Sequence, residues 1–235
     1  MLVGAVLGTG CVPRATMCVA TSECAAKASC VAGRCQPTGA TLAIQVSRRL
    51  LLDPAAVAYL RPGGARVAGA LLPPVFTLGR RDLGDAKLLL RFDVPLPPDA
   101  KVMEAYVLFL RAEGVDCDPS PIVLHAARIV EPWDASGISW ASQPRVEETR
   151  SPATIVFPTS QTFVRVDVKD LVVRWMAHDV HDQGVAILAD RPSATGVALA
   201  AGATSLPYGE GETWTSGGDP PGPMAASPKL ELYVR

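Results

Sequence analysis

Apolar and polar residues alternate along most of the chain, and turns rich in Gly and Pro separate the alternating segments. A period of two predicts β-strands, because successive side chains of a strand point to opposite faces of its sheet. Segment 101–111 is apolar on both faces, which predicts a central strand, whereas Pro73 and Pro74 predict that 75–78 is an edge strand. The predicted strands are 42–46, 50–52, 56–60, 75–78, 87–94, 101–111, 122–129, 155–157, 163–168, 185–188, 197–200 and 230–234.

The period changes near Asp167, within the segment that organises the second half of the chain. Apolar residues then recur at helical spacing as far as Trp175, which predicts a short amphipathic helix with Trp175 packed in the core. A polar turn follows, and the apolar segment 185–188 predicts a buried return strand. We therefore expect a strand, a short helix lying over an end of a sheet, and a return strand as one unit.

The composition places this pattern in a folded all-β protein. The 235 residues are 49% hydrophobic and 19% charged, and they include 20 Gly and 21 Pro, which suits a real core and frequent turns. Regular short strands divided by such turns predict an antiparallel sandwich or barrel. The net charge is −1 without a basic run, so we expect no nucleic-acid surface and no polybasic membrane patch. No apolar run reaches the roughly 20 residues that span a bilayer.

The first residues predict export. Residues 1–10 are small and apolar and are followed by Cys11, which resembles the end of a bacterial lipoprotein signal peptide. That resemblance implies a lipid on Cys11, which would tether the protein to a membrane without spanning it. The alternatives are an ordinary cleaved signal and a buried strand. We predict an exported protein of the bacterial cell envelope or outer surface, with a signal peptide at 1–10, a cysteine-rich spacer at 11–39 and a β domain at 40–235.

Five of the six cysteines lie between positions 11 and 35. If Cys11 carries lipid, four cysteines remain, and they can close two disulfides in three ways. A zinc site is the alternative, but the segment contains no CxxC pair and no His. We favour a spacer held together by disulfides, since so small a segment has little core of its own. The disulfide candidates are Cys18, Cys24, Cys30 and Cys35.

The order of four segments resembles a known family. These segments are KLLLRFDVPLPPDAKVMEAYVLFL, PIVLHAARIVEPWDASGISWASQP, VRVDVKDLVVRWMAHDVHDQGVAIL and SPKLELYV. They resemble the DNRLRE family of β-sandwich domains, which is related to a family of carbohydrate-binding modules. The resemblance covers 42–235 and implies a jelly-roll-like sandwich, preceded here by the disulfide-rich segment. It also implies an exported protein of surface or matrix assemblies, with carbohydrate binding as a property of some relatives.

Aromatic residues are the candidates for ligand contact, because their faces suit the apolar faces of sugar rings. Trp214 lies in a polar loop with Tyr208 nearby, and these two are the preferred candidates. Trp133 and Trp140 lie in a loop rich in Gly and Ser, and we favour packing against the sandwich for both, since Trp is usually largely buried.

Metal binding is the weaker interpretation of the polar turn after the helix. Its candidate ligands would be His178, Asp179, His181 and Asp182, but the spacing is not HExxH, so we favour a solvated turn. We expect no cofactor, with Ca²⁺ as the alternative at the acidic positions of the loops.

The sequence offers no convincing catalytic set. GxSxG is absent, and His125 lies within a predicted strand, where we interpret it as a hydrogen-bonded sheet residue. The predicted function is therefore a non-catalytic envelope protein whose sandwich binds polysaccharide or assembles with surface or matrix proteins. The alternatives are a structural subunit of an appendage or matrix without sugar affinity and, least favoured, a polysaccharide-cleaving enzyme.

Overall fold

The computed structural model describes residues 18, 21, 24–31, 34–37, 48–63, 72–97, 99–112, 121–156, 163–178, 181–190, 193–201 and 227–235. The chain divides into two compact units, Met1–Val46 and Ser47–Arg235. The predicted strand at 42–46 and the predicted domain boundary at residue 40 lie outside the described residues. No helix among the described residues has the length and apolar character needed to cross a bilayer.

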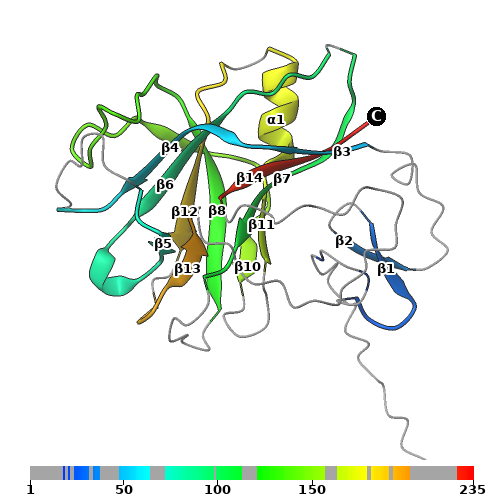
Figure 1. Cartoon of the computed structure of the whole chain (residues 1–235), viewed down its shortest axis with the longest axis horizontal. Coiled ribbons are helices and arrows are strands. Elements are labelled where there is room, and N and C mark those ends of the chain that lie inside the picture. Colours follow the sequence, from blue (N-terminus) through cyan, green and yellow to red (C-terminus); the bar gives the residue numbers. More distant parts are fainter. Residues whose placement is uncertain are drawn as a thin grey trace, which may run out of the picture. The chain divides into compact units, whose positions relative to one another are not determined.

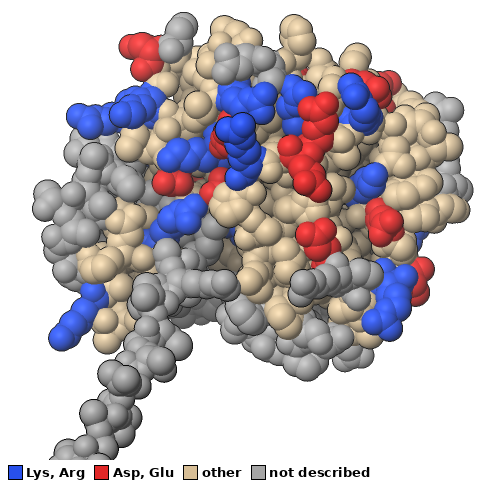
Figure 2. Space-filling model, turned by 180° about the vertical axis from the view of Figure 1, so that it is seen from behind, with Lys and Arg blue, Asp and Glu red and all other residues tan. Residues whose placement is uncertain are grey.

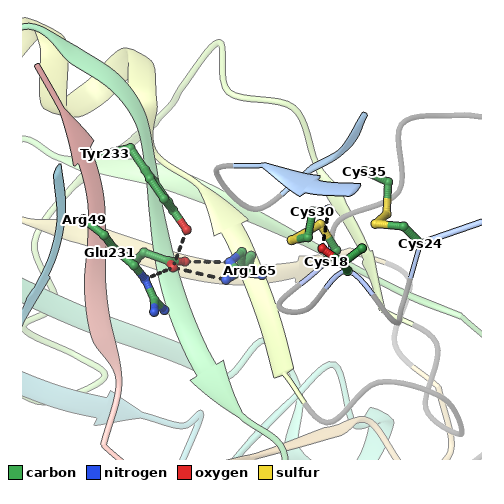
Figure 3. The surroundings of a disulfide bond; sticks show 9 residues. Cys18, Cys24, Cys30, Cys35, Arg49, Arg165, Glu231 and Tyr233 are labelled. Atoms are coloured by element: carbon green, nitrogen blue, oxygen red, sulfur yellow. Dashed lines mark hydrogen bonds and ion pairs between the residues drawn. A yellow bond between two sulfur atoms is a disulfide. The ribbon is translucent and has the colours of Figure 1, made fainter. Parts of the chain in front are cut away.

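The first unit contains a hairpin of strands β1 (Ala28–Val31) and β2 (Arg34–Pro37). Disulfides join Cys18 to Cys30 and Cys24 to Cys35, as Figure 3 shows. Cys30 and Cys35 lie opposite each other across the hairpin, so the two disulfides fasten adjacent strands to different parts of the preceding chain. The prediction of a small disulfide-rich segment is confirmed, and the structure selects one of the three possible pairings.

The second unit is a sandwich of antiparallel sheets (Figure 1). Strand β10 (Thr154–Val156) begins the six-stranded sheet, which continues with β8 (Ile122–Ile129), β12 (Val185–Asp190), β6 (Lys87–Phe92) and β4 (Pro54–Leu60), while β9 (Val146–Glu148) pairs with β8. The four-stranded sheet has the order β11 (Phe163–Asp167), β7 (Val102–Leu110), β14 (Lys229–Val234) and β3 (Arg48–Leu52). Strands β5 (Val75–Leu78) and β13 (Val197–Ala200) form a separate pair.

The inner faces of the sheets enclose the main core. On β7, Ala105, Val107 and Phe109 lie in it at the predicted period of two, and Val102 joins them beyond a register shift in the pairing with β14. Strand β7 lies between β11 and β14, so its prediction as a central strand is confirmed. Burial of such side chains is the main stabilising contribution to a sandwich of this kind.

Helix α1 (Lys169–Met176) lies at one end of the strands (Figure 1). It buries Leu171, Val172 and Trp175 in the core, which confirms the predicted amphipathic helix. Strand β11 before the helix belongs to the four-stranded sheet, whereas β12 after it belongs to the six-stranded sheet. The helix therefore closes the end of the sandwich as a connection between its two layers.

The predicted all-β, antiparallel, jelly-roll-like sandwich with one short helix is confirmed for the described residues. The predictions for 75–78, 122–129 and 197–200 match β5, β8 and β13 at both ends. Strand β9 was missed, because Val146 is its single apolar residue and VEE carries no alternation. Its pairing to β8 comes from the tertiary fold and not from a local pattern.

Candidate functional site

The outer face of the six-stranded sheet carries a row of three alanines and one leucine, here called the alanine row. Ala58 lies opposite Leu89, Leu89 opposite Ala186, and Ala186 opposite Ala127, so four strands share this row. All four side chains are at most 5% exposed, although they point away from the main core. A covering segment must therefore lie flat on this row, and short side chains give it the space to do so.

Trp133 is the centre of that covering segment, the loop 130–145. Trp133 is 8% exposed and packs in the cluster that contains Ala58, Leu89 and Ala186. The indole Nε1 donates a hydrogen bond to the carbonyl oxygen of Gln183 at 2.7 Å. Arg91 of β6 donates from Nη1 to the Trp133 carbonyl at 3.2 Å, and its guanidinium lies 5.6 Å from the centre of the Trp133 ring.

Trp140 lies further along the same loop and is half-buried. The ammonium of Lys87 lies 5.2 Å from the centre of its ring, a cation–π geometry. Gln143 donates from Nε2 to the Trp140 carbonyl at 2.9 Å, which fixes the backbone beside the ring. Lys87 and Arg91 lie four residues apart on the outer face of β6, so each tryptophan of the loop faces one cation of that strand.

The turn before β12 supports this loop from the side. Gly184 has φ +98°, and a Cβ there would lie 2.2 Å from the carbonyl oxygen of Leu90, so only glycine fits. Asp182 Oδ1 accepts a hydrogen bond from the Gly184 amide at 3.0 Å. The pKa of the Asp182 carboxyl is raised to about 6, mainly by burial. The hydrogen bond from Gly184 acts to lower this pKa, and the Asp93 carboxylate acts to raise it.

The rest of the outer face lies beyond the alanine row, on β8, β10 and β12. Leu188 lies opposite His125, Asp190 opposite Val123, and Val123 opposite Ile155. Ile155 is 39% exposed, which sets it apart from the covered residues of the same face. The side chains of His125 and Asp190 are 19% and 57% exposed, and 3.4 Å separates His125 Nδ1 from Asp190 Oδ2.

His125 differs from its prediction in one respect. It lies within a strand, as expected, but its buried Nδ1 makes no hydrogen bond among the described residues. The ring therefore faces the Asp190 carboxylate without the geometry of a hydrogen bond. The uncovered area of this face combines apolar side chains with an imidazole and a carboxylate, and we call the set Val123, His125, Ile155, Leu188 and Asp190 the open face.

A pocket of about 260 Å³ lies near helix α1 and is lined by Arg150, Asp170 and Arg174. Asp170 Oδ2 is buried and has no hydrogen-bond partner among the described residues. Figure 2 shows basic and acidic side chains interspersed over the upper part of its view. Besides the open face, this pocket is a second place for polar ligand groups, which would meet two guanidinium groups and one carboxylate.

The outer face of the four-stranded sheet carries a buried ion pair. Glu231 is 0% exposed and accepts hydrogen bonds from Arg165 at 2.6 and 3.1 Å and from Arg49 at 2.8 Å (Figure 3). Burial raises the pKa of the Glu231 carboxyl, but the hydrogen bond and charge of Arg165 outweigh it and hold that pKa below its usual range. Burial and the Glu231 carboxylate together raise the pKa of Tyr233 to about 12.

The predicted metal residues do not form a complete set among the described residues. His178 and His181 are exposed, and Asp182 uses one carboxylate oxygen on the Gly184 amide. Within the part of the chain that the structure describes, three possible ligand atoms lie within 4.8 Å of one another at Cys18, Cys24 and Cys35, whose sulfurs belong to disulfides. Asp179 lies outside the described residues, so the metal interpretation stays a prediction.

Other predicted site residues also lie outside the described part. These are Cys11, Trp214, Tyr208 and the acidic positions considered for Ca²⁺. Of the four aromatic candidates, the structure therefore places Trp133 and Trp140. It brings both into one loop on one sheet face and packs both against that face, as the sequence favours.

Residues 80–204 match a family of carbohydrate-binding modules, which is the class of β-sandwich that this fold represents. The match spans 125 of the 235 residues, from just before β6 to just after β13. The chain therefore belongs to carbohydrate-binding module family 96. No curated protein matches the sequence. The relation to carbohydrate-binding modules is confirmed, whereas membership of the DNRLRE family stays a prediction.

The open face was not predicted from the sequence, although the pattern of strand 122–129 contains a sign of it. The predicted strand 122–129 has a polar residue, His125, in phase with apolar residues, which marks an outer face that is not wholly covered. Asp190 lies beyond the predicted end of strand 185–188, because the strand continues for two further residues. Register between the two strands, which local pattern does not give, brings His125 and Asp190 together.

Proposed function

We propose that this protein is a non-catalytic polysaccharide-binding protein of the bacterial cell envelope, and that the six-stranded sheet and its loop 130–145 carry the binding. The observation that supports this most strongly is the family match over 80–204, because that range contains β6, β8, β12 and the loop with both tryptophans. Trp140 is half-buried with the Lys87 ammonium over its ring, so an aromatic side chain and a cation lie next to each other on this face.

Export and a lipid anchor complete the proposal. Cys11 follows a short apolar segment, and the lipid would place the sandwich at a membrane surface. The two disulfides of the first unit support export, since disulfides persist in oxidising compartments and not in the bacterial cytoplasm. The crosslinked segment then serves as a spacer between the anchor and the sandwich.

A glycan-array screen of the full, disulfide-intact chain tests the binding. We expect binding to at least one polysaccharide class, with no release of reducing ends from the bound polymer. Trp140→Ala and Trp214→Ala measured alongside separate a contact on the sheet face from a contact in the 202–226 segment. Folded protein that binds no glycan would favour a structural role, and reducing-end release would favour an enzyme.

A further inference from the structure

We propose that the open face is a sugar-binding subsite that recognises two adjacent hydroxyl groups of a pyranose ring, with His125 and Asp190 as the polar contacts. This inference rests on the proposed polysaccharide binding and goes beyond it by naming the face, the residues and the hydroxyl pattern.

The two parts of this one sheet face differ in how far they are covered. Leu89, Ala127 and Ala186 are at most 1% exposed under the loop 130–145. Ile155 is 39% exposed, and Val123 and Leu188 are half-buried. The loop therefore covers the alanine row and leaves an apolar floor open beside it, of the kind on which the C–H face of a sugar ring can lie.

The polar groups at this floor come from two neighbouring strands. Leu188 and Asp190 lie two residues apart on β12, and both point to the outer face, because side chains alternate along a strand. Register places His125 opposite Leu188 and Val123 opposite Asp190, so His125 and Asp190 are diagonal neighbours. Polar groups at opposite corners of an apolar patch can contact the rim of a ring while the patch contacts its face.

His125 and Asp190 can both accept hydrogen bonds from a ligand. His125 Nδ1 is buried and lies 3.4 Å from Asp190 Oδ2, so the exposed part of the ring lies among its other atoms. A carboxylate beside Nδ1 favours the proton on that nitrogen, which leaves Nε2 as a hydrogen-bond acceptor. The Asp190 carboxylate accepts as well, and its side chain is 57% exposed. Two neighbouring acceptors match two neighbouring hydroxyl donors.

The hydroxyl pattern makes the proposal selective among polysaccharides. The 1,4-linked xylans and glucomannans keep adjacent hydroxyls at carbons 2 and 3 of each ring. A linear 1,3-linked β-glucan has none within the chain, because its hydroxyls at carbons 2 and 4 flank the linkage. The full chain should therefore bind xylan or glucomannan and show at least tenfold weaker affinity for the linear 1,3-linked β-glucan.

Affinity electrophoresis and calorimetry of the full chain on these three polymers test the inference. We expect Asp190→Ala to weaken binding about tenfold and His125→Ala about fivefold, since each loses a hydrogen bond to the ligand. Asp53→Ala is the matched control, because Asp53 is an exposed carboxylate that pairs with Lys229 of β14, outside the open face. Thermal unfolding of each variant verifies that the fold is kept.

The outcomes separate this inference from the proposed function. Wild-type affinity in a folded Asp190→Ala variant, or equal affinity for the 1,3-linked polymer, would overturn the subsite. If Arg174→Ala abolishes binding and Asp190→Ala does not, the pocket near α1 is the site, and polysaccharide binding stands without this subsite. If the wild-type chain binds no polysaccharide in any screen, the proposed function fails together with the subsite.

Discussion

The indole nitrogen of Trp133 donates a hydrogen bond to the carbonyl oxygen of Gln183, 50 residues further along the chain, at 2.7 Å. This bond joins the loop 130–145 to the turn that leads into β12. Arg91 of β6 contacts the same tryptophan at its carbonyl and over its ring. Three segments of the six-stranded sheet thus meet at Trp133, which holds the loop against the alanine row.

Replacement of Trp133 tests this role. Trp133→Phe keeps an aromatic ring but leaves the Gln183 carbonyl without its donor, so we expect a loss of about 1–2 kcal/mol in the free energy of unfolding. Trp133→Ala also removes the buried ring and should cost about 3–5 kcal/mol. Urea denaturation measures both. Trp140→Phe is the control and should cost less than Trp133→Phe, since the Trp140 ring is half-buried; equal losses would contradict an anchoring role for Trp133.

The buried ion pair predicts a second stability effect. Glu231→Gln leaves the Arg165 guanidinium buried without its carboxylate, and we expect a loss of about 3–5 kcal/mol in the free energy of unfolding. Glu147→Gln is the matched surface control, since Glu147 pairs with Arg128 at 2.6 Å and is 47% exposed. That variant should lose much less stability than Glu231→Gln, because solvent screens an exposed ion pair. Similar losses for the two variants would show that burial of Glu231 does not matter.

Asp182 predicts a dependence of stability on pH. Its pKa is about 6 in the folded protein against 3.8 for the free side chain, so the folded state binds the proton more tightly than the unfolded state. The contribution of this group to stability therefore falls as pH rises from about 4 to about 6. Asp182→Asn should flatten that part of the curve and be more stable than wild type at pH 7.

Chemical denaturation at a series of pH values between 4 and 7.5 measures this effect. Asp134→Asn is the control, because hydrogen bonds from Ser136 lower the pKa of that exposed carboxyl. It should keep the wild-type slope between pH 5 and 7. An unchanged slope in Asp182→Asn would show that another group causes any dependence in this range.

Lipidation of Cys11 is testable in a bacterial host. When the chain is expressed with its own N-terminal segment, we expect incorporation of labelled palmitate and recovery in the membrane fraction. Cys11→Ser should abolish both. Cys117 is the sixth cysteine and lies far from the N-terminal segment in the sequence. Cys117→Ser should keep both, which excludes a non-specific effect of removing a thiol. Label that persists in Cys11→Ser would place the lipid elsewhere or refute the anchor.

The parts of this fold that local pattern encodes were predictable from the sequence. Helix α1 was found from the spacing of Leu171, Val172 and Trp175, and β7 from two apolar rows. Strand β9 was not predictable, because it forms only by pairing with β8. The sheet to which a strand belongs was also hidden, since β11 and β12 flank one helix and enter different layers.

The candidate site was predictable only in part, for the same reason. Aromatic character pointed to Trp133 and Trp140, and the usual burial of Trp pointed to packing, which the structure shows. The environment of His125 could not be predicted from the sequence, because Asp190 lies on another strand, 65 positions away. The register between the two strands brings the two side chains together. Contacts between segments that are distant in the sequence form this part of the surface, and the local periodicity of a strand does not predict such contacts.

Binding at the open face is tested directly by the change in backbone amide chemical shifts when xylan oligosaccharide is added to the full chain. We predict that the largest changes fall on β8, β10 and β12, at Val123, Ile155, Leu188 and Asp190, and on the adjoining loop at Trp140. Changes confined to Arg150, Asp170 and Arg174, or no changes with xylan or glucomannan oligosaccharides at millimolar concentration, would contradict binding at the open face.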